Sequence, residues 1–345
     1  MKLKDQKSEL RKDIVSGEWV LVAAGRAKRP QVKKGVVVKE SKKGCPFENP
    51  QAKGQNGDPL FWLPRPSGAK TQAKKTLKDW FVQAIPNKYP AVFNHPTESC
   101  PEISPQHMAS SIDGYGSHEV VITRDHDRSI GKMNTAEAQL VIETYVARYR
   151  AISQDTCTRY VHIFHNHKRE AGASIMHPHS QIISFPIVPP DINHSIEGSR
   201  QYFKKHKSCV HCAMMAWERS QKKRIVAENR DFIAVAPYAS RVSFEVRIYP
   251  RKHGAHFERI SNAQKFSLAE MMSWVFGSLL KELNDPAYNF FIHTTPVADG
   301  ASDHYHWHIE ILPAIGHLAG LELGTGIDVA TFPPEEVASL LKKRI

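Results

Sequence analysis

The chain has 345 residues, of which 41% are hydrophobic, so it is long and apolar enough for one large domain or two ordinary ones. No run approaches the roughly 18 apolar residues of a membrane-spanning helix, and the charged start, MKLKDQKSELRKD, lacks the apolar stretch of a secretory signal, so we expect a cytoplasmic protein. A net charge of +12 favours anionic partners, either phosphate ligands or nucleic acid, although the basic residues are scattered and form no RNA-binding signature.

The first half of the chain is predicted to contain strands that lead into a long helix. WFVQAIPNKYP (80–90) and HEVVITRDH (118–126) are apolar runs, and the second ends on a basic-x-His pattern at His126. The helix is expected to begin after Asn134, which forms a capping-box pattern with Glu137. Its apolar stripe has helical spacing and consists of Val141, Ile142, Tyr145 and Tyr149. Such a stripe predicts packing on a sheet.

The segment GASIMHPHSQII (172–183) carries two histidines around a proline, followed by a glutamine and an apolar run. The run predicts a buried strand, in which His177, His179 and Gln181 point to one face and Ser180 to the other. Pro178 lacks an N–H group, so it belongs at an edge or at the start of the strand. The small residues before the motif, including Ser174, would let another group approach the backbone closely.

The second half repeats this order. FEVRIYPRKH (244–253) ends at His253, and DHYHWHIEILP (303–313) again has alternating polar residues. Between them a helix is predicted after a capping box of Ser261 and Gln264, and its apolar stripe consists of Leu268, Met272, Val275 and Leu279. We therefore predict an α+β fold of two tandem repeats, each a mainly antiparallel sheet with packed helices. The predicted halves are 1–190 and 191–345, and residues 184–206 form the connection between them.

Two clusters of metal ligands are predicted, one in each half. Two cysteines separated by two residues form a compact pair of thiolates, and two histidines complete a tetrahedral zinc set. In the second half this set is Cys209, Cys212, His253 and His306. In the first half it is Cys45, Glu48, His126 and His177. Carboxylate is a harder ligand than thiolate, so this first site is expected to bind zinc more weakly or to be empty.

The remaining cysteines, Cys100 and Cys157, are interpreted as structural. The total of five is odd, and an odd count in a chain of this length does not suggest a disulfide framework.

The motifs, taken together, resemble the galactose-1-phosphate uridylyltransferase family, a branch of the histidine-triad superfamily. The resemblance is greatest to the branch that includes plant ADP-glucose:phosphate adenylyltransferase. It covers nearly the whole chain, and the segments that carry it occur in the family's order: RKDIVSGEWVLVAAGRAKRP, IPNKYPAV, GASIMHPHSQ, SFEVRIYPRKH, YHWHIEILP and GLELGTG. The resemblance implies that both halves are histidine-triad-like.

The resemblance also implies roles for individual residues. His179 would be the nucleophile that takes a nucleoside monophosphate, His177 the metal ligand beside it, and Gln181 a contact to the transferred phosphate. Other positions match those that hold the nucleotide-sugar, namely Arg26, Arg29, Asn87 and Asn166. Glu48 departs from the family pattern, in which cysteine is usual, and this puts the first metal in question but not the nucleophile.

The expected function is transfer of a nucleoside monophosphate between a nucleotide-sugar and a sugar phosphate or inorganic phosphate. A neutral imidazole is a good nucleophile near pH 7, and a covalent nucleotidyl-histidine splits one difficult step into two. The first expectation is a UDP-glucose:hexose-1-phosphate uridylyltransferase, and the alternative is an ADP-sugar phosphorylase. A non-catalytic zinc protein that binds nucleic acid is a third interpretation, which the repeated motif disfavours. We expect no nucleic-acid or membrane partner, and a homodimer is a candidate assembly.

Overall fold

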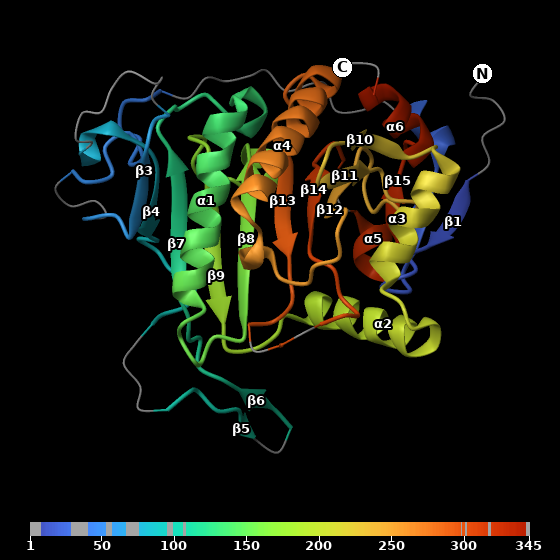
Figure 1. Cartoon of the computed structure of the whole chain (residues 1–345), viewed down its shortest axis with the longest axis horizontal. Coiled ribbons are helices and arrows are strands. Elements are labelled where there is room, and N and C mark those ends of the chain that lie inside the picture. Colours follow the sequence, from blue (N-terminus) through green and yellow to red (C-terminus); the bar gives the residue numbers. More distant parts are fainter. Residues whose placement is uncertain are drawn as a thin grey trace.

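The computed structural model describes residues 8–28, 41–52, 57–66, 76–94, 99–105, 108–297, 299–300, 302–316 and 319–342. Its centre is one antiparallel sheet, with the strand order β10-β11-β12-β14-β13-β8-β9-β7-β4-β3 (Figure 1). The strands are β3 (Phe61–Pro64), β4 (Trp80–Pro86), β7 (His118–Thr123), β8 (Tyr160–His167), β9 (His179–Phe185), β10 (Ile225–Glu228), β11 (Phe232–Val235), β12 (Val246–Pro250), β13 (Tyr288–His293) and β14 (His308–Pro313). The predicted α+β class with a mainly antiparallel sheet is confirmed.

The two halves contribute equivalent strands in the same chain order. Strands β3, β4, β7, β8 and β9 come from the first half, and β10 to β14 come from the second. The halves join where β8 pairs with β13, so the sheet continues from one half into the other. The predicted boundary at residue 190 stays a prediction.

Two long helices, α1 (Thr135–Ile152) and α4 (Asn262–Leu283), lie side by side on one face of the sheet (Figure 1). Each begins with the predicted capping box, in which Asn134 accepts from the Glu137 N–H and Ser261 accepts from the Gln264 N–H. The predicted apolar stripes of both helices are buried in one core between helices and sheet. The opposite face of β9 is therefore left to the polar side chains of the motif.

The ends of the described chain meet in a second, small sheet. Strands β1 (Glu9–Lys12) and β2 (Trp19–Val22) form a hairpin, and β15 (Asp328–Ala330) pairs with β2 in parallel. Arg11 donates to the Glu335 carboxylate of helix α6 (Pro334–Lys342), so the hairpin packs on the second half.

The remaining elements fill the connections. Most of the predicted connection between halves is helical and forms α2 (Pro190–His206). Pro190 is tolerated at its first position, because the N–H group that proline lacks has no partner inside the helix there. The short elements are α3 (Val210–Gln221), α5 (Gly320–Thr325), β5 (Ser104–Pro105), β6 (Ser110–Ser111) and the 3-10 turns η2 (Ala24–Lys28), η3 (Leu77–Asp79), η4 (Ile130–Lys132), η5 (Arg169–Ala171) and η6 (Phe257–Arg259). No helix of the described residues is long and apolar enough to cross a membrane.

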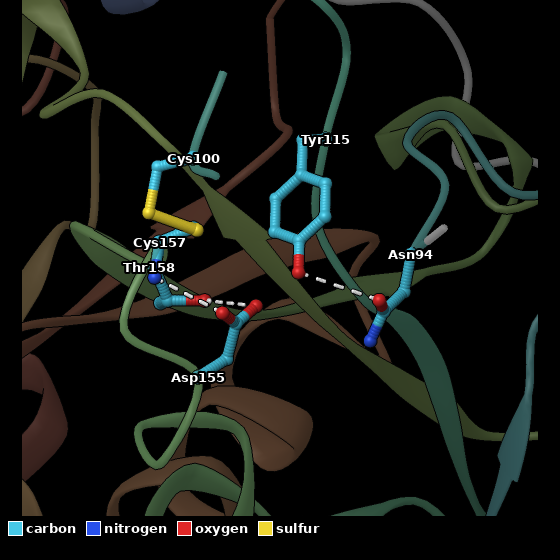
Figure 2. The surroundings of a disulfide bond; sticks show 6 residues. All are labelled: Asn94, Cys100, Tyr115, Asp155, Cys157 and Thr158. Carbon is cyan, nitrogen blue, oxygen red and sulfur yellow. Dashed lines mark hydrogen bonds between the residues drawn. A yellow bond between two sulfur atoms is a disulfide. The ribbon is translucent and has the colours of Figure 1, made fainter. Parts of the chain in front are cut away.

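The structure contains one disulfide among the described residues, which the odd cysteine count did not suggest, between the two cysteines interpreted as structural. Cys100, in the connection between β4 and β7, is bonded to Cys157, in the turn between α1 and β8 (Figure 2). Asp155 shapes that turn by accepting from the Cys157 N–H at 3.0 Å and from the Thr158 hydroxyl at 3.3 Å. The odd count of five was misleading because the other three cysteines belong to the metal-ligand clusters, which leaves an even pair.

Candidate active site and metal centres

His179 is the first residue of β9, and its ring is held in one orientation by the backbone. Its Nδ1 lies 2.9 Å from the carbonyl oxygen of His177, so Nδ1–H donates and Nε2 keeps its lone pair. Burial lowers the pKa of His179, and the hydrogen bond to the carbonyl offsets only part of that effect. The side chain is therefore a neutral imidazole near pH 7, with Nε2 as the nitrogen that can attack.

The predicted alternation along β9 is present. Ser180 points to the helix face, where its hydroxyl lies 2.5 Å from the Tyr145 hydroxyl and 2.9 Å from His165 Nδ1. The neighbouring residues, His179 and Gln181, consequently lie on the other face. Pro178 immediately precedes the strand, as expected for a residue without an N–H group, but β9 is an interior strand of the sheet.

Phe47 covers the two histidines of the motif. Its ring centroid is 5.1 Å from that of His179 and 5.9 Å from that of His177. Phe47 is itself 7% exposed and packs with Trp80, Ile85 and other apolar side chains. The turn that carries Cys45 and Glu48 is thereby fixed against the motif.

The first predicted metal cluster is assembled in the structure. One ligand atom from each of Cys45, His126 and His177 lies within 4.8 Å of the other two. The Glu48 carboxylate lies 2.7 Å from His126 Nδ1 and 3.6 Å from His177 Nδ1. His177 Nε2–H donates to the Thr123 carbonyl oxygen at 2.6 Å, which leaves Nδ1 able to bind a metal ion. These side chains fit a metal ion, with Glu48 beside both imidazoles.

The second predicted cluster is also assembled, by Cys209, Cys212, His253 and His306. Cys209 immediately precedes helix α3, and the Cys212 sulfur lies 3.4 Å from His253 Nδ1 and 3.5 Å from His306 Nδ1. The hydrogen bond from Cys212, together with one from His306, lowers the pKa of Cys209 and so favours a thiolate. The buried Nε2 of His306 has no hydrogen-bond partner among the described residues. Two sulfurs and two imidazoles in this arrangement fit a tetrahedral metal ion.

A third cluster was not predicted: His293, His308 and Glu310. His308 occupies the position in β14 that His179 has in β9, and its Nδ1–H donates in the same way to the His306 carbonyl oxygen at 3.0 Å. Its Nε2, however, lies 3.3 Å from the Glu310 carboxylate, which also pairs with buried Arg247 at 3.2 Å. In the second half, the His308 ring therefore belongs to a network with Glu310 and Arg247. In the first half, the equivalent His179 is bound through Nδ1, and its Nε2 faces no carboxylate of the described residues.

The structure also places the predicted nucleotide-sugar ligands. Asn87 follows β4 and, through the ring of His118, meets Gln181. Asn166, on β8, lies one position beyond the pair formed by His165 and Ser180, and the β-sheet register puts it beside His179.

Other predicted ligands are less well connected. Ser174 is exposed in the loop before the motif. Arg26 is half-buried in η2, and no side-chain hydrogen bond or ion pair of the described residues joins it to the motif. Arg29 lies outside the described residues. His118 was not predicted as a site residue, and the only signal for it was a polar residue at the start of an apolar strand.

Comparisons with known proteins agree with this geometry. Residues 1–189 match the family model of the galactose-1-phosphate uridyl transferase N-terminal domain. The chain is 30% identical to the ADP-glucose phosphorylase of Arabidopsis thaliana, over 99% of this chain and 94% of that protein. It is 28% identical to the galactose-1-phosphate uridylyltransferase of Thermotoga maritima, over 97% and 98%.

A solved structure shows the same fold. The crystal structure of an Arabidopsis thaliana ADP-glucose phosphorylase with bound ADP-glucose superimposes with a TM-score of 0.80, at 28% identity and 99% coverage of both chains. An enzyme family that matches more than half of the sequence disfavours the non-catalytic nucleic-acid-binding interpretation. The chain belongs to the galactose-1-phosphate uridyl transferase family and is a nucleotidyltransferase.

Proposed function

We propose that this enzyme transfers a nucleoside monophosphate from a nucleotide-sugar to a phosphate acceptor through a covalent adduct on His179. The observation that carries the proposal is the orientation of the His179 ring, whose Nδ1–H donates to the His177 carbonyl and whose Nε2 is left with its lone pair. Gln181 stands two residues further along the same strand face, where an amide N–H can bind a phosphoryl oxygen without exchanging protons.

The chemistry follows from that orientation. Nε2 attacks the α-phosphorus, an N–P bond forms, and the bond from phosphorus to the bridging oxygen breaks to release the sugar phosphate. The Nδ1 proton stays in its bond to the His177 carbonyl and stabilises the positive charge that develops on the ring. An oxygen of the acceptor phosphate then attacks the same phosphorus, and the N–P electron pair returns to Nε2. Two displacements replace one direct transfer.

The first candidate donor is UDP-glucose, with a hexose 1-phosphate as acceptor. A second candidate, an ADP-sugar with inorganic phosphate as acceptor, is favoured by the TM-score of 0.80 to the structure with bound ADP-glucose. The remaining predicted ligands, Arg26, Arg29, Asn87, Asn166 and Ser174, are proposed to hold the nucleotide-sugar. The homodimer remains a prediction, and analytical ultracentrifugation would test it by measuring the mass of the protein in solution.

We also propose zinc as the metal of both ligand clusters. Thiolate and imidazole are ligands that zinc prefers, and the second cluster supplies two of each. In the first cluster, zinc on His177 would stiffen the segment that carries His179, and its role would be positional. No step of the transfer requires the metal itself.

Mass spectrometry of the intact protein tests the proposal. The enzyme is mixed with UDP-glucose or ADP-glucose without an acceptor, and the added mass identifies a uridylyl or an adenylyl group. His179→Ala is expected to add no mass while keeping its circular dichroism spectrum. His308→Gln is the matched control, since it alters the equivalent histidine of the second half, and a folded His308→Gln protein should label like wild type. Labelling that survives in His179→Ala would contradict the assignment.

A further inference from the structure

His118, the first residue of β7, lies between two side chains of the proposed active site. Its Nε2 is 2.9 Å from Gln181 Oε1 and 3.1 Å from Asn87 Nδ2. Its Nδ1 is 3.0 Å from the backbone nitrogen of Ala91, in the segment that follows β4. The ring is half-buried. One imidazole thus connects the motif strand, the predicted ligand Asn87 and the loop after it.

The backbone contact determines which nitrogen of His118 carries the proton. A peptide N–H can only donate, so Nδ1 must accept from Ala91 and hold a lone pair. A neutral imidazole has one proton, which is then on Nε2. That proton is donated to Gln181, and only the amide oxygen of Gln181 can accept it.

The amide of Gln181 therefore has one permitted orientation. Reversing it would bring its NH2 group against Nε2–H of His118, with two donors facing each other and no acceptor. With the oxygen on His118, the NH2 end of Gln181 is the end that can reach a ligand. A phosphoryl group has only acceptor oxygens, so this is the orientation that phosphate binding requires.

The amide of Asn87 lies beside the same ring, but the backbone sets its orientation. The Asn87 Oδ1 accepts from the Tyr89 N–H at 2.9 Å, which fixes its amide with Nδ2 towards His118. Because Nε2 of His118 carries a proton, its 3.1 Å contact with Asn87 Nδ2 is not a hydrogen bond, and His118 does not determine the orientation of Asn87.

We propose that His118 is a positioning residue that orients the Gln181 amide as a donor toward the phosphates of the nucleotide-sugar. This inference rests on the proposed function, since it concerns the same transfer. His118 does not touch the reacting atoms. It acts through Gln181, whose N–H would bind the phosphoryl oxygen as charge develops there.

Three variants of His118 separate this role from simple loop anchoring. His118→Gln keeps a terminal amide N–H near the position of Nε2, which can donate to Gln181, and loses the acceptor for the Ala91 N–H. His118→Asn keeps an acceptor near the position of Nδ1 for Ala91 and loses the donor to Gln181. His118→Phe keeps the ring and loses both. If the ring positions Gln181, His118→Gln should be the least impaired of the three.

The measurement is the single-turnover rate of nucleotidyl labelling, with donor affinity determined separately. We expect His118→Phe and His118→Asn to lower the rate by about 10- to 100-fold with a smaller change in affinity, and His118→Gln to recover most of the loss. In a double-mutant cycle, His118→Phe should add little to the defect of Gln181→Ala, because one acts through the other. A near-wild-type His118→Asn with an impaired His118→Gln, or additive defects, would overturn the inference while leaving the proposed function intact.

A second readout does not depend on activity. Nitrogen-15 NMR of the imidazoles, assigned by the signal lost in His118→Phe, should show His118 neutral with its proton on Nε2. A proton on Nδ1 would overturn the inference even in an active enzyme. Wild-type protein that labels with neither donor would remove the proposed function and this role with it.

Discussion

Phe164 on β8 lies directly opposite Phe291 on β13, at the junction between the two halves of the sheet. These two residues are equivalent in the repeat, since Phe164 pairs with Gln181 and Phe291 pairs with Glu310 on the neighbouring strands. An approximate two-fold axis therefore passes between them. On one side of it the strand carries a neutral amide beside an open imidazole, and on the other a carboxylate neutralised by Arg247. One frame thus supports a proposed transfer site and a structural ion-pair network.

Removing a thiolate from the second metal cluster should destabilise the protein more than it slows the transfer. Cys209→Ser leaves three ligands, and the free energy of metal binding contributes directly to the free energy of folding. We expect about one tightly held zinc per wild-type chain from this cluster, a lower unfolding temperature in the variant, and labelling of His179 that persists below that temperature. Elemental analysis and calorimetry check this. A wild-type preparation that contains no zinc and unfolds at the same temperature as zinc-containing protein would rule out this metal site.

Restoring a thiolate in the first cluster should increase metal content. The turn at Cys45 directs the Glu48 side chain toward both imidazoles, with its carboxylate 2.7 Å from His126 Nδ1, so Glu48→Cys would direct a thiolate toward the same cluster. We expect zinc to rise toward two per chain and to resist a chelator that strips the wild-type first site, with turnover unchanged or modestly altered. Glu48→Gln is the matched control, because it keeps the size of the side chain and supplies no thiolate. No additional metal in Glu48→Cys would show that Cys45, His126 and His177 do not form a zinc site.

Breaking the disulfide should lower stability under oxidising conditions. The bond links residues 57 apart, and cross-links of this kind typically contribute about 2–4 kcal/mol by restricting the unfolded chain. Cys100→Ser and Cys157→Ser should each unfold at lower denaturant concentration than wild type, and a reductant should bring wild type down to the same value. When wild-type protein is unfolded without reductant and its metal is removed, a thiol assay should detect three thiols, those of Cys45, Cys209 and Cys212. Five reactive thiols would mean that the bond does not form.

Acid should remove the stabilisation that comes from Asp285. Burial alone would raise the pKa of this carboxyl, but a hydrogen bond from His167 and the charges of Lys168 and Lys132 hold it well below its usual value. A group with a depressed folded pKa stabilises the protein above its unfolded pKa of about 3.9, and this contribution is lost as the pH falls further. Asp285→Asn tolerates the positive φ of 57° at this position.

We expect Asp285→Asn to unfold at a lower temperature than wild type at pH 7. The difference should shrink as the pH falls below about 3.9, because the unfolded wild-type chain then binds a proton at Asp285 that the folded protein, with its lower pKa, does not bind. Thermal unfolding at a series of pH values measures this. A difference that is independent of pH would show that the charge of Asp285 is not the source of the stabilisation.

The sequence alone determined the features that depend on near neighbours in the chain. The capping boxes at Asn134 and Ser261 and the apolar stripes after them involve residues within a few positions of one another, so spacing was sufficient to predict both helices. The alternation of His179, Ser180 and Gln181 follows from strand geometry in the same way. The repeat then predicted the two ligand clusters, because equivalent residues of a duplicated fold occupy equivalent positions.

Only the tertiary structure decided which distant side chains meet. The pairing of Cys100 with Cys157 depends on how the connection after β4 folds over the turn before β8, which no local pattern encodes. Likewise, His118 meets Gln181 because β7 pairs with β9 in one register. It meets Ala91 because the segment after β4 passes beside the start of β7. Contacts of this kind are set by packing between elements far apart in sequence, whereas periodicity and capping are set within a single element. That difference is why the sequence predicted the strand that carries His179, and only the fold revealed the ring that orients Gln181.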